Sequence, residues 1–172
     1  MRGKICRKCS RAKRPSAGGM PSWRCVGRSG LVSEVVLLDS SAVLAWIYRE
    51  EGFEIMGRML SRAADEDRRV FMAQISLLEL AKSMKQAQPN LYPQSMSVVR
   101  MAPIDWLQVT DAEAVAAGEL RADYRMSTAD AIIVVLARRL GAELWHKDLE
   151  FDSLPKNFVK VKRLPYKKRR KK

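Results

Sequence analysis

The chain of 172 residues is long enough for one domain with a substantial hydrophobic core and too short for two domains of ordinary size. Its net charge of +13 suggests a nucleic acid or another acidic partner, but the excess charge lies at the two ends. Residues 1–34 hold nine Lys and Arg with one acid, and residues 167–172 are six consecutive cations. Residues 35–166 hold 17 Lys and Arg against 18 Asp and Glu, so the central part is nearly neutral.

The sequence lacks the segments that direct a protein into or across a membrane. No apolar run approaches the roughly 20 residues that cross a bilayer. The basic N-terminus also lacks the apolar segment of a secretory signal. All three cysteines precede residue 26, so no disulfide framework can hold the central part together. We therefore expect a cytoplasmic protein in a reducing compartment.

We place one folded domain at residues 34–166, between a basic extension and a basic tail. Residues 1–33 are rich in Arg, Lys, Ser and Gly without sustained periodicity, which predicts a disordered N-terminal extension. A Cys-x-x-Cys pair beginning at Cys6 has the spacing of half a zinc knuckle. With Cys25 it supplies three ligands, whereas a closed structural zinc site needs four. Residues 167–172 form the C-terminal basic tail.

Short apolar segments alternate with helical ones along the central part. The predicted strands are residues 35–38, 69–73, 98–104, 142–146 and 158–161. The predicted helices are residues 42–51, 54–64, 76–88, 110–121 and 127–140. Strands that alternate with helices in this way predict an α/β fold with a mainly parallel sheet and right-handed crossovers.

The strongest of these signals surround Asp130 and Asp148. Ser127 begins a helix that is apolar around most of its circumference, and Gly141 follows two arginines in its last turn. We expect this helix to be buried, with Asp130 in its first turn. The next strand ends close to Asp148, so helix and strand can bring two carboxylates to one edge of the sheet.

Two further acids occupy comparable positions. Asp39 directly follows the first strand, and Glu79 lies in the first turn of the helix after the second strand. Each acid also has a purely structural interpretation. Asp39 can be a helix cap or an Asx-turn residue, and Glu79 can complete a capping box with Ser76.

The four carboxylates together indicate a metal site. Clustered acids repel one another and raise each other's pKa, and a bound hard cation relieves that repulsion. A site of few carboxylates and water suits Mg²⁺ or Mn²⁺. The sequence has no glycine-rich phosphate loop, no Ser-His-Asp set and no available Cys-His pair. Metal held by acids is therefore the only catalytic chemistry that the sequence offers.

Four segments, in this order and spacing, resemble the motifs of the PIN-domain ribonucleases, and in particular the VapC-type toxins: VVLLDSSAVLAW, ISLLELA, MSTADAIIVVLARRLGA and HKDLEF. The resemblance covers roughly residues 35–161. It implies a single three-layer α/β/α domain around a mainly parallel sheet, with four acids converging at one pole. The acids that it implies as catalytic metal ligands are Asp39, Glu79, Asp130 and Asp148. It also implies that Ser41 supports the metal site by a hydrogen bond.

The sequence departs from the family pattern near the last acid. His146 stands where Thr or Ser is usual, and a neutral imidazole there can hydrogen-bond a phosphate or a carboxylate. Glu150 and Asp152 follow Asp148 closely, so which of the three binds metal directly stays open, with Asp148 favoured.

Membership of this family implies metal-dependent hydrolysis of RNA that leaves 5′-phosphate and 3′-hydroxyl ends. It further implies a cognate antitoxin protein and a homodimer. The tail at residues 167–172 is a candidate for non-specific attraction of RNA toward an acidic site. A solvated end or an antitoxin contact is the alternative for this tail. Two other functions stay open, a non-catalytic PIN-like module that binds RNA or protein and a housekeeping RNA-processing nuclease.

Overall fold

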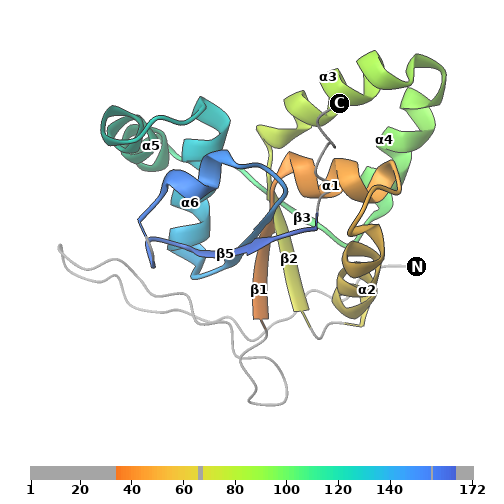
Figure 1. Ribbon diagram of the computed structural model, residues 1–172, viewed down its shortest axis with the longest axis horizontal. Helices are drawn as coiled ribbons and strands as arrows, with labels where there is room; N and C mark the ends of the chain where they lie inside the picture. The colour runs from red at the N-terminus through yellow and green to blue at the C-terminus, as the bar shows by residue number, and fades with distance from the viewer. Residues whose placement is uncertain (1–33, 66–67, 156, 166–172) are drawn as a thin grey trace, which may run out of the picture.

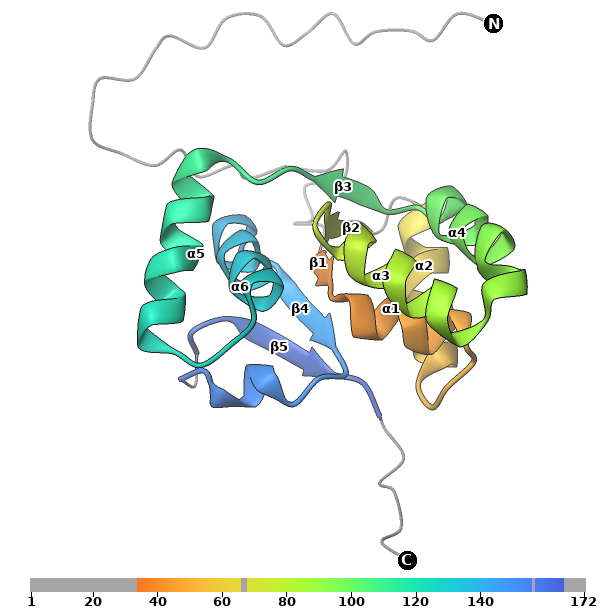
Figure 2. The ribbon, with the colours of Figure 1, turned by 90° about the horizontal axis from the view of Figure 1, so that it is seen from above.

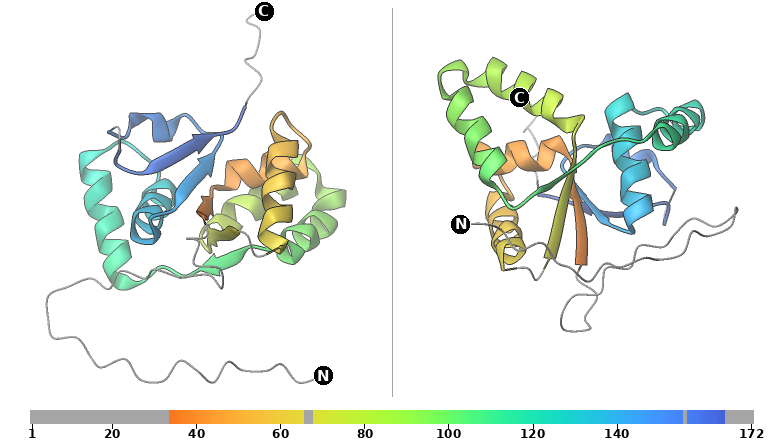
Figure 3. Two further views of the ribbon diagram at one scale, coloured as in Figure 1. Left: turned by 90° about the horizontal axis from the view of Figure 1, so that it is seen from below. Right: turned by 180° about the vertical axis from the view of Figure 1, so that it is seen from behind.

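A five-stranded parallel sheet lies at the centre of the computed structural model, which describes residues 34–65, 68–155 and 157–165 (Figure 1). The strands are β1 (Glu34–Leu38), β2 (Arg68–Ala73), β3 (Asp105–Leu107), β4 (Glu143–His146) and β5 (Lys160–Arg163). Their order is β3-β2-β1-β4-β5, and every neighbouring pair is parallel. The edge strands are therefore β3 and β5 (Figure 3). β1 is central, with Leu37 paired to Phe71 on one side and Leu144 on the other.

Helices cover both faces of the sheet. The α-helices are α1 (Ser40–Ile47), α2 (Phe53–Ala64), α3 (Ser76–Ala87), α4 (Tyr92–Met101), α5 (Asp111–Asp123) and α6 (Thr128–Leu140). Two 3₁₀ turns, η1 (Pro89–Leu91) and η2 (Glu150–Ser153), complete the described helical elements. α1 to α4 lie on one side, and α5 and α6 lie on the other (Figures 1 and 2). Crossovers of one hand produce this division, because the chain runs outward from β1 to β3 and then returns past β1 to β4.

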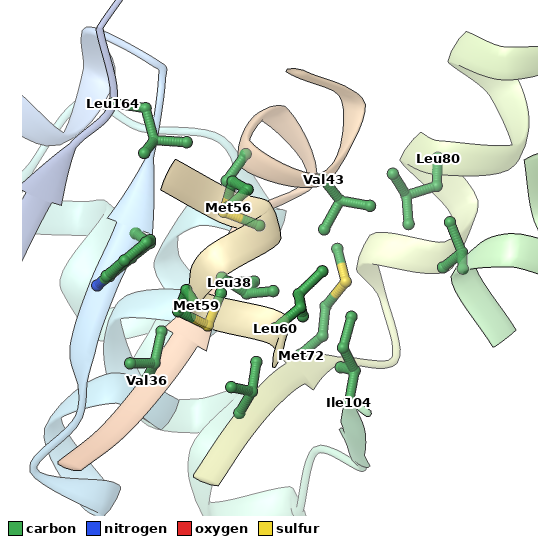
Figure 4. Close-up of a cluster of buried hydrophobic side chains, with 14 of the residues drawn as sticks. Val36, Leu38, Val43, Met56, Met59, Leu60, Met72, Leu80, Ile104 and Leu164 are labelled. Carbon is green, nitrogen blue, oxygen red and sulfur yellow. The ribbon is translucent and has the colours of Figure 1, made fainter. Parts of the chain in front are cut away.

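The two helical layers define two hydrophobic clusters. Successive side chains of a strand point to opposite faces, so Val36 and Leu38 of β1 pack in one cluster and Leu37 in the other. Figure 4 shows the first cluster, in which Met56 and Met59 of α2 lie over β1. The second cluster contains the apolar face of α6. The prediction of a three-layer α/β/α domain around a parallel sheet is thus confirmed, and both faces of the central strand are covered.

The predicted strand at residues 98–104 is wrong. That part of the chain is the end of α4, and the third strand is the three-residue β3 that follows it. Pro93 lies in the first turn of α4, where proline costs no hydrogen bond. Val99 of α4 is fully buried and Met96 packs beside it, a three-residue spacing that belongs to a helix.

Several predicted boundaries also differ. α1 ends at Ile47 instead of reaching residue 51, and Gly52 does not end it. Gly52 instead precedes α2 with φ of 95°, a left-handed conformation that favours glycine. The last strand lies two residues later than predicted, at Lys160–Arg163.

The predicted capping box of α3 is also wrong. Ile75 caps this helix without a side-chain hydrogen bond, and Glu79 turns away from Ser76 toward another partner. By contrast, Thr110 and Glu113 form the reciprocal capping box that begins α5.

The predictions for the basic extension, the Cys6 pair with Cys25 and the tail at residues 167–172 lie outside the described residues. Within the described ranges, no helix combines the length and apolarity that a membrane crossing requires.

Candidate active site

Five carboxylates line one pocket at the carboxyl ends of β1 and β4. These two strands flank the point where the chain changes direction across the sheet, which is where α/β proteins commonly bind ligands. The pocket has a volume of about 350 Å³. The carboxylates that line it are Asp39, Glu79, Asp130, Asp148 and Glu150. The structure therefore brings together the four acids that the sequence favoured and places Glu150, the alternative to Asp148, in the same pocket.

Asp39 lies at the base of the pocket, directly after β1. Its residue is only 3% exposed, and its carboxylate accepts hydrogen bonds from the Ser41 amide at 2.9 Å and from the Ser41 hydroxyl. The same hydroxyl accepts a hydrogen bond from the Lys147 amide at 2.9 Å, which joins the ends of β1 and β4. Ser41 thus orients Asp39.

Burial raises the pKa of Asp39 from 3.8 to about 6. The hydrogen bonds from Ser41 lower this pKa and do not outweigh the loss of hydration. The charges of Asp130 and Glu79 raise it further. A bound cation would reverse this penalty, because it favours the ionised form of every nearby acid.

Glu79 reaches the pocket from the first turn of α3, where it is partly buried. The Ser40 hydroxyl donates to the Glu79 carboxylate at 2.7 Å and lies 3.5 Å from an Asp39 carboxylate oxygen. Ser40 thereby connects the acids of two different elements, α3 and the end of β1. The sequence interpretation missed Ser40, because the resemblance assigns a supporting hydroxyl only to Ser41.

Asp130 is held by the start of α6. The Ser127 hydroxyl accepts a hydrogen bond from the Asp130 amide at 3.1 Å, and Asp130 is 8% exposed. Behind it, α6 is buried along most of its length, including Ala131, Ile133 and Val134. The predicted cap, buried helix and Gly141 stop are all present. This rigid support fixes Asp130 in the wall of the pocket.

Asp148 and Glu150 approach from the turn after β4, and both are exposed. The Glu150 amide donates to the Asp148 carboxylate at 3.1 Å, and the Glu150 carboxylate accepts from the Ser127 amide at 3.4 Å. The side chain of Asp130 raises the pKa of Glu150, first through a hydrogen bond and second through the negative charge of Asp130. The turn after β4 is thus connected to the start of α6.

His146 does not line this pocket. The ring is fully buried at the end of β4 and packs edge-on against Phe151, with 4.8 Å between ring centroids. Its Nδ1 lies 2.8 Å from the backbone carbonyl of Asp148, so Nδ1 carries the proton and donates it. The ring therefore supports the turn that carries Asp148. The side chain of Asp152 is not among those that the structure describes.

The donor set suits a hard cation. Carboxylate and hydroxyl oxygens line the pocket, and these are the ligands of Mg²⁺ and Mn²⁺. Among the described side chains, no group of three or more His, Cys, Asp or Glu forms a ready-made cage. Mg²⁺ commonly keeps several water molecules and binds one or two carboxylates, so this spacing still fits it.

Fold and pocket together define a three-layer α/β/α protein with an acidic site at the switch point of a parallel sheet. The sequence model of the PIN domain matches residues 36–157, and the chain belongs to the PIN-domain family.

Solved structures share this fold at low sequence identity. VapBC2 from Rickettsia felis, bound to a DNA fragment from its promoter, gives a TM-score of 0.61 at 13% identity and covers 76% of this chain and 99% of its own. DNA-bound VapBC from Salmonella typhimurium gives a TM-score of 0.57 at 17% identity. The match covers 76% of this chain and 97% of the Salmonella chain. VapC20 from Mycobacterium tuberculosis, a toxin that cleaves the sarcin-ricin loop, gives a TM-score of 0.55 at 15% identity. The match covers 68% of this chain and 92% of VapC20. No curated protein matches the chain.

Proposed function

We propose that this protein is a metal-dependent endoribonuclease and the toxin component of a toxin–antitoxin pair. The observation that carries the proposal is the gathering of five carboxylates in one pocket of a PIN domain. Solved structures of similar fold include two VapBC complexes and VapC20, a toxin that cleaves the sarcin-ricin loop. In this proposal Asp39, Glu79, Asp130 and Asp148 hold Mg²⁺ or Mn²⁺.

The acids of the pocket and the groups that support them then have separate roles in the hydrolysis. A metal ion bound by these acids would supply a water of lowered pKa and would neutralise charge on the scissile phosphate. Water adds to phosphorus, the bond from phosphorus to O3′ breaks, and O3′ leaves as a hydroxyl, so the products carry 5′-phosphate and 3′-hydroxyl ends. Ser40 and Ser41 orient Glu79 and Asp39, and α6 holds Asp130 in place.

The proposal includes two protein partners. A cognate antitoxin would block the acidic pocket, and a second copy of the chain would form a homodimer. The substrate is RNA, whose polyanionic backbone the acidic pocket itself repels.

A cleavage assay with a pool of random-sequence RNA tests the activity. The full chain, with Mg²⁺ or Mn²⁺, should cut a subset of the pool, and sequencing of the fragments should map the cleaved bonds. Ligation that requires a 5′-phosphate identifies the product ends. Absence of metal-dependent cleavage across the pool would favour a non-catalytic binding module.

The Ser40→Ala variant should cleave about tenfold more slowly than the wild type at limiting Mg²⁺, since loss of a supporting hydrogen bond typically costs 10–100-fold in metal affinity or activity. Glu79 loses its 2.7 Å donor in this variant. Raising the Mg²⁺ concentration should recover part of the rate. Titration of the cleavage rate with Mg²⁺ measures the change.

Ser83→Ala is the matched control for Ser40→Ala. Ser83 lines the same pocket, but in the structure its backbone carbonyl, and not its hydroxyl, accepts the Tyr48 hydroxyl. We expect the Mg²⁺ dependence of Ser83→Ala to match that of the wild type. Equal losses in both variants would contradict a specific role for Ser40.

Removal of residues 167–172 should weaken RNA binding without lowering the rate at saturating RNA. The six cations of this tail are suited to non-specific contact with phosphates. If all six contact a single strand, the slope of log K against log salt should decrease in magnitude by about 4, at roughly 0.7 per phosphate. Binding to a single-stranded RNA across a salt series measures that slope. An unchanged slope would assign the tail to another role.

A further inference from the structure

The acidic pocket also contains a lysine. Lys82 lies on α3 three residues after Glu79, so both side chains project from the same face of the helix, and both line the pocket. Leu80 and Met84 on the opposite side of α3 are fully buried in the core. This packing holds α3 in place, and the backbone of Lys82 therefore has a fixed position at the wall of the pocket.

Neighbouring cations already have partners. The ammonium of Lys147 lies 2.6 Å from Glu50, and its side chain is only 12% exposed. The ammonium of Lys85 lies 5.5 Å from the ring centroid of Tyr92. By contrast, Lys82 is exposed, and within the described part of the chain it makes no ion pair, hydrogen bond or ring contact. Among the described residues that line this pocket, Lys82 is the cation that can contact a bound anion.

We infer that Lys82 binds a non-bridging oxygen of the scissile phosphate, an inference that rests on the proposed RNA hydrolysis. The pocket wall presents five carboxylates, which suit a metal and repel a phosphodiester. An ammonium on a flexible stem supplies the missing attraction as a mobile point charge. Its contribution is largest in the transition state, when negative charge on the phosphoryl oxygens must be stabilised. The acids thus hold the metal, and Lys82 holds the substrate.

The test compares Lys82→Gln, Lys82→Arg and Lys85→Gln in the full chain, with an RNA that the wild type cleaves. Lys82→Gln should lower kcat about 10²-fold at saturating Mg²⁺, as loss of a transition-state donor does. Its KM should change by less than about threefold. Lys82→Arg should recover part of the rate, because it keeps the charge. Lys85→Gln, on the same helix, should match the wild type.

The possible results distinguish failure of the inference about Lys82 from failure of the proposed function. If high Mg²⁺ restores the wild-type rate to Lys82→Gln, the lysine only balances the charge of the acids, and the inference is wrong. Equal rates for Lys82→Gln and the wild type would also overturn it, while leaving RNA hydrolysis in place. Failure of the wild type to cleave RNA would instead overturn the proposed function itself. The unfolding temperature and the Mg²⁺ affinity of Lys82→Gln should be no lower than those of the wild type. These two measurements distinguish loss of the phosphate contact from loss of the fold.

Discussion

Asp130→Asn should lower the RNA cleavage rate by about 10³-fold, because removing a charged ligand forfeits several kcal/mol of metal-assisted stabilisation and each 1.4 kcal/mol is a factor of ten. The fold should remain intact. The amide side chain has the same shape, and the Asp130 backbone amide keeps its bond to the Ser127 hydroxyl. Neutralisation also relieves repulsion with Asp39 and Glu150. Single-turnover cleavage and thermal unfolding, measured on the same preparation, check both expectations.

The matched control is Asp111→Asn. Asp111 is also an acid in the first turn of a helix, α5, but it is exposed and lies outside the pocket. Both variants lose a favourable interaction with a helix N-terminus, worth about 0.3–1 kcal/mol. Only Asp130→Asn should lose activity. Cleavage by Asp130→Asn at the wild-type rate would show that this carboxylate does not hold the catalytic metal.

Strong local patterns in the sequence predicted the parts of the fold that are buried on all sides. β1 is apolar from residue 35 to residue 38 because it is the central strand, and α6 is largely apolar because the sheet and α5 cover it. α4 and β3 lie at the edge of the sheet, where burial imposes a weaker pattern. Pro93 does not interrupt α4, because the first turn of a helix accepts proline.

Parallel strands end at the same edge of a sheet, which made the shared location of Asp39 and Asp148 predictable, whereas the convergence of all four acids was implied by the resemblance to PIN domains. The contacts among their supporting groups were not predictable. Glu79 had an equally good local partner in Ser76, and only the tertiary packing of α1 beside α3 places Ser40 within 2.7 Å of it. Likewise, the burial of His146 depends on Phe151 of η2, a contact that no local pattern indicates.

Mg²⁺ should stabilise the protein more at pH 7.5 than at pH 5.0, because protons and metal compete for Asp39. The pKa of Asp39 is raised from 3.8 to about 6 in the folded chain. At pH 5.0, about one pH unit below that value, the apparent metal affinity falls roughly tenfold. At a concentration of 100 times the Kd, Mg²⁺ adds about 2.7 kcal/mol at pH 7.5, which is roughly 5–11 °C in Tm. The gain at pH 5.0 should be about half as large, as measured by thermal unfolding with and without Mg²⁺ at constant ionic strength.

Asp39→Asn separates this competition from general acid effects. In the metal-free wild type, the folded chain binds the Asp39 proton more tightly than the unfolded chain, so this group lowers stability as pH rises from 3.8 to about 6. Above pH 6 the full cost, about 3 kcal/mol from the size of the shift, is present. Without metal, the Tm of Asp39→Asn should therefore be higher than that of the wild type at pH 7.5, and the two Tm values should be closer at pH 4. Mg²⁺ should raise the Tm of Asp39→Asn only slightly at pH 7.5 and at pH 5.0. An equal Mg²⁺ gain in both proteins would place the cation away from Asp39, since a ligand that binds elsewhere does not compete with its proton.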